Sequence, residues 1–164
     1  MGYDAAAWSD FAVAVASAAA ALSGLLFVAV SINLTRILAF PNLPARAGQT
    51  LIMLVTPLIV ALLVLIPGQR RSVLGAELVA GAALLVLALG PLNRPSTRSV
   101  EENRFGYVLS RVAPAVLVVV FLGTAGITLL TLAGGGLYWI VPAVVVAIVA
   151  GLGNAWVLLI EILR

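Results

Sequence analysis

The 164-residue sequence contains no cysteine, no histidine and no lysine. The absence of cysteine excludes disulfides, thiol nucleophiles and thiolate metal sites. The absence of histidine and lysine excludes imidazole ligands for haem or zinc, histidine general bases and Schiff-base lysines. Only carboxylates, hydroxyls, amides and arginine are left for chemistry, and they form no recognisable catalytic dyad. We therefore predict a protein that is not an enzyme and that binds no metal and no cofactor.

Charge is also scarce, because only 9% of the residues are charged while 63% are hydrophobic. The mean hydropathy is +1.23. Soluble domains carry about 25% charged residues, so this composition predicts an integral membrane protein. The net charge is only +3, and we attribute it to loop arginines that meet lipid headgroups rather than to a nucleic-acid surface.

Five apolar stretches are long enough to cross a bilayer, which takes about 20 apolar residues. They cover residues 8–38, 50–66, 72–90, 100–132 and 137–164, approximately. The pattern predicts one all-α domain, a polytopic bundle of five transmembrane helices. The N-terminal tail has no positive charge, so we interpret the first stretch as a retained span and not as a signal peptide.

The arginines are distributed unequally between the two sides of the predicted bundle. The loop 67–72 carries Arg70 and Arg71, and the N-terminal tail and the turn 133–136 carry none. The other seven arginines lie around the two remaining loops or at the C-terminus. The positive-inside rule then places the N-terminus outside and the C-terminus in the cytoplasm. We predict a multi-pass protein of the plasma membrane, namely a bacterial inner membrane.

Small residues recur every four positions on the first and last spans. One series is Ala12, Ala16, Ala20 and Gly24, and the other is Ala143, Ala147, Gly151 and Ala155. Such series allow close approach between transmembrane helices. They predict self-association into a homo-oligomer, or association with another membrane protein.

Glu77 is an acid within the third apolar stretch. Acids in transmembrane segments usually face the bundle interior and find a partner there. Its helical face also carries Ala80 and Gly81, so we expect it to point into a helix contact. Candidate partners at matching depth are Thr124, Thr128 and Thr131, or a nearby arginine. The alternatives are a structural acid, a proton- or cation-binding group and a contact between subunits.

A second group of polar residues gathers near the cytoplasmic ends of the first, fourth and last spans. Its members are Asn33, Arg36, Arg111, Asn154 and Glu161. The two arginines could extend to the headgroups, or one of them could pair with Glu161 and join three spans. Asn154 lies deeper and is expected to bridge helices. Because the spans offer little polarity between this group and Glu77, we expect no continuous hydrophilic pore through one monomer.

The segments SGLLFVAVSINLTRIL (residues 23–38) and LPARAGQTL (residues 43–51) resemble those of a group of small bacterial integral membrane proteins. The arginine-only composition and the PGQ motif before the acid-bearing span are similar too. Some members of that group are labelled as modulators of a membrane-bound protease. The resemblance covers about the first half of the chain. It implies a class of protein and almost no mechanism, because it provides no catalytic residues to carry over.

Together these features predict a non-enzymatic structural or accessory membrane protein, or a modulator of a larger membrane complex. The alternative is a small ion channel or proton-coupled transporter that uses Glu77.

Overall fold

The computed structural model describes residues 6–93 and 104–163, and these residues form helices without a strand. Five segments within these ranges are long and apolar enough to cross a membrane. They are Ser9–Ile32, Leu43–Val64, Arg71–Leu92, Phe105–Thr131 and Gly136–Glu161. The predicted all-α bundle of five spans is therefore confirmed, and it indicates a multi-pass membrane protein.

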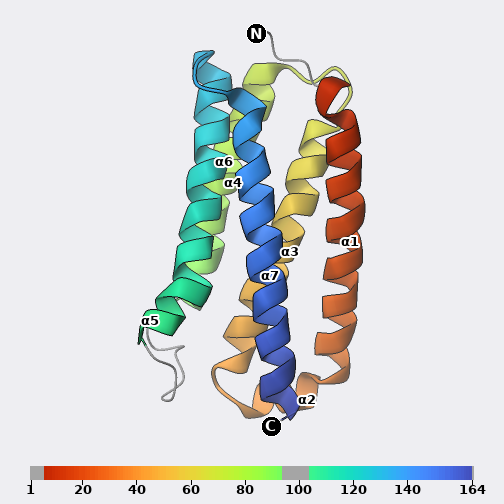
Figure 1. Cartoon of the computed structure of the whole chain (residues 1–164), viewed down its shortest axis with the longest axis vertical. Coiled ribbons are helices and arrows are strands. Elements are labelled where there is room, and N and C mark those ends of the chain that lie inside the picture. The colour runs from red at the N-terminus through yellow and green to blue at the C-terminus, as the bar shows by residue number, and fades with distance from the viewer. Residues whose placement is uncertain (1–5, 94–103, 164) are drawn as a thin grey trace.

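Four of the spans form a closed ring, and the fifth lies outside it (Figure 1). The ring consists of α3 (Leu43–Val64), α4 (Arg71–Leu92), α6 (Ala113–Thr131) and α7 (Ile140–Leu163). Within it, α3 and α6 each contact both α4 and α7. The outer span is α1 (Ser9–Ile32), which packs mainly on α3. Because α3 contacts three other spans, its polar residues can reach most of the bundle.

The first two spans differ in extent from the sequence prediction. The first span breaks at Asn33, so α1 ends at Ile32 and a short helix, α2 (Leu34–Ala39), follows. The second span begins at Leu43, seven residues before the predicted start at residue 50. Pro44 does not prevent this early start, because the N–H groups in the first turn of a helix form no hydrogen bond within the helix. The N–H that proline lacks is therefore not needed there. The early start makes residues 43–49 helical rather than part of a turn.

The fourth span combines three helical segments: α5 (Arg104–Tyr107), the π-helical turn η3 (Val108–Val112) and α6. Its predicted start at residue 100 lies outside the described residues, and so does residue 164 at the end of the last span. The last span opens with the short helix η4 (Gly136–Trp139), which continues into α7. Gly134, Gly135 and Gly136 make the turn between α6 and η4 with positive φ angles, which glycine adopts without strain.

Helices α4 and α6 approach each other most closely at two glycines. A Cβ atom on Gly126 would lie 2.6 Å from the carbonyl oxygen of Gly75 and 2.9 Å from the amide nitrogen of Val79. A Cβ atom on Gly75 would lie 3.0 Å from the carbonyl oxygen of Gly126. The two backbones are thus in contact, and no side chain fits between them at this level.

The two small-residue series lie in different surroundings, one inside the bundle and the other partly on its surface. On α7, Ala143, Ala147 and Gly151 are buried within the chain, and a Cβ atom on Gly151 would clash with Leu54 of α3. This part of the α7 face is therefore covered by α3 within the chain, and self-association of the protein stays a prediction. On α1 the buried face is Ala12, Val15, Ala19, Ser23 and Leu26. Of the predicted series, Ala12 is therefore buried, Ala16 is half-buried, and Ala20 and Gly24 are exposed.

The two ends of the bundle differ in their polar residues. We call one the arginine end; it contains α2, the first turns of α3, α5 and the last turn of α7 (Figure 1, bottom). The other is the Glu77 end, which contains the start of α1, the turn 65–70 and η4 (Figure 1, top). Between them, large apolar side chains are exposed on the outer surface, such as Leu25, Leu87 and Val149 at 65–71%. Such a surface fits contact with lipid chains.

Candidate functional site

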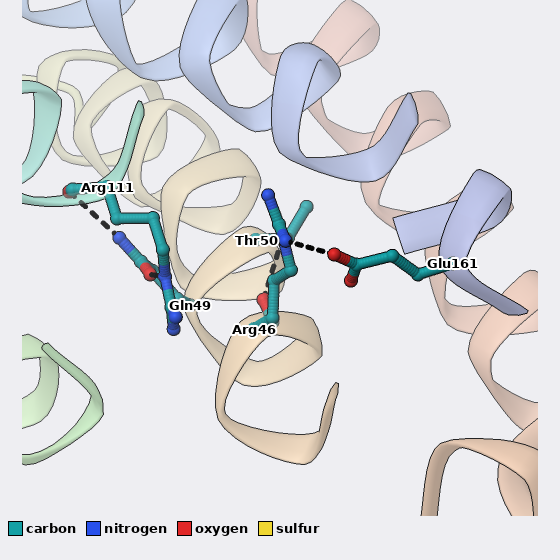
Figure 2. Close-up of polar contacts among 5 residues, drawn as sticks. All are labelled: Arg46, Gln49, Thr50, Arg111 and Glu161. Carbon is teal, nitrogen blue, oxygen red and sulfur yellow. Dashed lines mark hydrogen bonds and ion pairs between the residues drawn. The ribbon is translucent and has the colours of Figure 1, made fainter. Parts of the chain in front are cut away.

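The arginine end contains a group of polar side chains buried inside the bundle (Figure 2). Its fully buried members are Arg46, Gln49, Thr50, Arg111 and Asn154, and Glu161 lies at its edge. Three of the six come from α3, on positions 46, 49 and 50, which share one face of a helix. We call this group the arginine cluster. Because buried charges are costly unless they are paired, its contacts decide what the site can do.

Arg46 forms an ion pair with Glu161 across the α3–α7 contact. The Nη1 atom of Arg46 lies 2.8 Å from Oε1 of Glu161 (Figure 2). The arginine side chain is 6% exposed, and the carboxylate side chain is 31% exposed. The pair therefore joins the first turn of α3 to the last turn of α7 at the boundary between the bundle interior and its surroundings. Thr50 donates to the Arg46 carbonyl from one turn further along α3.

Gln49 and Arg111 form a reciprocal contact between α3 and the π-helical turn. Nε of Arg111 donates to Oε1 of Gln49 at 2.7 Å, and Nε2 of Gln49 donates to the Arg111 carbonyl oxygen at 2.9 Å (Figure 2). Both side chains are 1% exposed. The amide thus satisfies one side-chain donor and one main-chain acceptor of the same residue, which fixes the position of Arg111 relative to α3.

The contact of Asn154 with the fourth span depends on Pro114, which follows the π-helical turn. Pro114 has no N–H, so it cannot donate to the Ser110 carbonyl four residues before it. Nδ2 of Asn154, on α7, donates to that carbonyl oxygen at 3.4 Å. Asn154 is 3% exposed and therefore bridges α7 to the start of the fourth span. The sequence prediction that Asn154 joins two helices is confirmed.

The guanidinium of Arg111 also reaches the end of α4. Its Nη2 atom donates to the carbonyl oxygen of Leu92 at 3.3 Å, and its Cζ atom lies 5.3 Å from the centre of the Tyr107 ring. Carbonyls at a helix C-terminus carry partial negative charge and attract cations. Arg111 therefore contacts α3 and α4 at once, and with Asn154 and Glu161 the arginine cluster joins all four helices of the ring.

Several members of this cluster differ from the sequence prediction. Glu161 pairs with Arg46 and not with Arg36 or Arg111, so that predicted pairing is wrong. The cause is the early start of α3, which turns Arg46 from a loop residue into a buried helical one. Arg36 is exposed on α2, and Asn33 donates to the Ala29 carbonyl of its own helix. Neither belongs to the buried group.

Arg46, Gln49 and Thr50 were not among the site residues predicted from the sequence. Their spacing could have indicated a shared helical face, because residues three and four positions apart lie on the same side of a helix. They stand at the start of an apolar stretch in which Thr56 is the one further residue with a hydroxyl. Because the second span was predicted to begin at residue 50, Arg46 and Gln49 were placed outside it, and so the polar face of α3 was not recognised.

The structure does not bring Glu77 together with its predicted threonine partners. Its carboxylate accepts a hydrogen bond from Nε2 of Gln69, in the turn before α4. Thr124, Thr128 and Thr131 instead donate to carbonyl oxygens of their own helix. The α4 face that continues from Glu77, with Ala80, Leu84 and Ala88, is exposed. The expectation that Glu77 points into a helix contact is wrong, because Gly75 and Leu78 occupy the face of α4 that meets α6.

The comparisons add no family to these observations. No protein-family model, no curated protein and no solved structure matches this chain. In the described residues, no three acidic side chains lie together in a way that would hold a metal ion. The features of the molecule that bear on its function are therefore the arginine cluster, the apolar core and the position of Glu77.

Proposed function

We propose that this chain is a non-enzymatic membrane protein with a structural or accessory role, which modulates or supports a larger membrane complex. The observation that carries the proposal is the arginine cluster. Its charged and amide groups bond to other helices of the same chain, which makes the ring of four helices a rigid unit. A rigid unit with an apolar outer surface suits a protein that presents fixed surfaces to neighbours in the membrane.

The interior between the two ends supports the same role. Apolar residues contributed by α3, α4, α6 and α7 fill it, including Met53, Leu78, Val118, Leu122 and Ala147, each at most 2% exposed. A cavity of about 10 Å³ lies where α1, α3 and α7 meet, and all of its lining residues are apolar. This is at the lower limit of the volume that one water needs, and an apolar cavity stays dry. A packed dry interior favours support over conduction.

The proposed membrane is the bacterial inner membrane, with the arginine end in the cytoplasm. The positions of the described arginines support this orientation under the positive-inside rule. Arg36, Arg46 and Arg111 lie on elements of the arginine end, and Arg70 and Arg71 lie at the other end. In this orientation the exposed Arg36 would face anionic headgroups of the cytoplasmic leaflet.

Cross-linking in native membranes tests the accessory role. A photo-reactive residue placed at exposed lipid-facing positions, such as Leu87 or Val149, should capture one defined protein at a stoichiometric level. A copy of this chain as the captured species would identify a homo-oligomer. Capture of lipid alone at every exposed position, together with purification of an isolated monomer from those membranes, would contradict the proposal.

The second candidate function is a small channel or proton-coupled transporter that uses Glu77. The observation in its favour is that the carboxylate is half-buried within an apolar span and borders an open groove on α4. Purified protein in liposomes should then carry an ion or proton flux that Glu77→Gln abolishes. Equal flux from the variant would exclude Glu77 as the transport site, and an absence of flux in both would leave the accessory role as the better account.

A further inference from the structure

A second feature, separate from the arginine cluster, is a shallow and open hollow on the outer face of α4, which we call the α4 groove. Its lining residues are Ser72, Val73, Ala76, Glu77 and Ala80. The opposite face of the helix carries Leu74, Gly75, Leu78 and Ala82, which are buried. The groove therefore faces away from α6, toward the surrounding membrane. It is apolar apart from one hydroxyl and one carboxylate.

The carboxylate of Glu77 makes this groove different from an ordinary lipid-facing surface. Glu77 follows the first residue of α4 by six positions, which is about 9 Å along the axis. Among the described residues it has one hydrogen bond, from Gln69, and it forms no ion pair with an arginine. Acids within a membrane span normally face the bundle interior and are paired. An outward-facing acid in an apolar groove indicates that a cationic group of another molecule covers it.

A second copy of this chain is a poor candidate for that molecule. A twofold contact through the groove places the same surface of both copies together, so both Glu77 carboxylates meet at the same depth. Like charges at short distance in a medium of low dielectric constant repel strongly. A helix of a different protein, with a cation at this depth, has the complementary charge.

We propose that the α4 groove binds one transmembrane helix of another protein, and that this helix carries an arginine or lysine at the depth of Glu77. The small side chains of Ser72, Ala76 and Ala80 allow that helix to approach closely, while Glu77 selects the cation and its register. This inference rests on the proposed accessory role and adds the place and chemistry of the contact.

The test uses the full-length chain and designed partner helices, reconstituted together in phosphatidylcholine vesicles. Each designed helix is a labelled Leu/Ala span with one arginine, placed about 9 Å from one membrane surface, in the centre, or replaced by leucine. Energy transfer to a label on this chain reports association. The helix with arginine at the matched depth should bind, and it should bind about tenfold more weakly to Glu77→Gln, as expected for losing an interhelical contact of about 1–2 kcal/mol.

Three further variants separate loss of this contact from a general change in folding. Ala76→Leu should fill the groove and weaken binding, whereas Ala20→Leu, on the exposed face of α1, should leave binding unchanged. The Glu77→Arg variant should no longer bind the designed helix with arginine. It should instead bind a designed helix that carries glutamate at the same depth. This exchange depends on charge complementarity, so a general change in folding does not produce it.

Three results would overturn the inference: equal binding of the leucine helix, unchanged binding by Glu77→Gln, or two copies of this chain associating through the groove. The accessory role is judged separately by cross-linking. If native membranes yield a partner whose capture is unaffected by Glu77→Gln and Ala76→Leu, the accessory role stands and the α4 groove is the wrong site.

Discussion

The two ends of this bundle place charged residues differently within apolar helices. At the arginine end, Arg46 and Arg111 turn inward and bond to neighbouring helices. At the Glu77 end, the acid remains on the outer face of α4, with one amide from the adjacent turn as its hydrogen-bond donor. The same composition thus produces a cluster bonded between helices at one end and an outward-facing acid at the other.

The backbone explains the difference. At the arginine end, Pro114 frees the Ser110 carbonyl, and the end of α4 offers the Leu92 carbonyl, so acceptors exist between the helices. At the Glu77 end, Gly75 and Gly126 bring the backbones of α4 and α6 into contact. That contact leaves no space for a side chain such as that of Glu77 between the two helices. The backbone contact at one end and the available carbonyl acceptors at the other therefore account for the different positions of Glu77 and Arg111.

The largest effect is expected from separating α4 and α6. Gly126→Leu places a side chain against the backbone of Gly75 and Val79, so it should lower the free energy of unfolding by about 3 kcal/mol or more, or prevent folding. Reversible unfolding by sodium dodecyl sulfate in mixed micelles, followed by circular dichroism, measures the change. Gly24→Leu is the control, because nothing lies within 4 Å of a Cβ atom there. Equal stability of the two variants would show that the helices do not cross at Gly126.

The next effect concerns the reciprocal contact between Gln49 and Arg111. Gln49→Leu leaves the Arg111 Nε atom and carbonyl without this partner, so it should reduce stability by about 1–3 kcal/mol. The same unfolding measurement on Gln49→Leu, Arg111→Leu and the double variant gives their coupling energy. A coupling near zero would mean that the two side chains do not act together.

A smaller loss is expected from the ion pair at the edge of the cluster. Arg46→Leu should cost about 1–2 kcal/mol, because Glu161 is partly exposed and can recover some solvation. Glu161→Gln should cost less, since its amide oxygen can still accept from Arg46. Hydrogen exchange of the last turn of α7 should rise in Arg46→Leu. Unchanged exchange there would indicate that this end of α7 is held by packing alone.

The smallest effect is expected at the other end. Glu77→Gln retains a hydrogen-bond acceptor for Gln69 and lies on an exposed face, so the stability of the isolated protein should change by less than about 0.5 kcal/mol. The unfolding assay used for Gly126 measures this as well. A loss as large as that of Gln49→Leu would show that Glu77 is a structural acid, and the contrast between the two ends would disappear.

Much of the fold follows from hydrophobic length. The five spans could be predicted because about 20 apolar residues are needed to cross a bilayer, whatever their tertiary contacts. The extent of the second span could not, since Pro41 and Pro44 indicate a turn unless Pro44 occupies the first turn of a helix. That one difference moved Arg46 into α3 and changed the partner of Glu161.

The sequence by itself determined that this is an apolar helical bundle whose chemistry is restricted to arginine, carboxylates, hydroxyls and amides. Only the tertiary structure decided which of these groups meet. Partner choice depends on the rotation of each helix and on where two backbones touch. Here the Gly75–Gly126 contact excludes side chains at one end, and the Ser110 carbonyl that Pro114 leaves free accepts from Asn154 at the other. For this reason Arg111 has its partners inside the bundle while Glu77 faces outward.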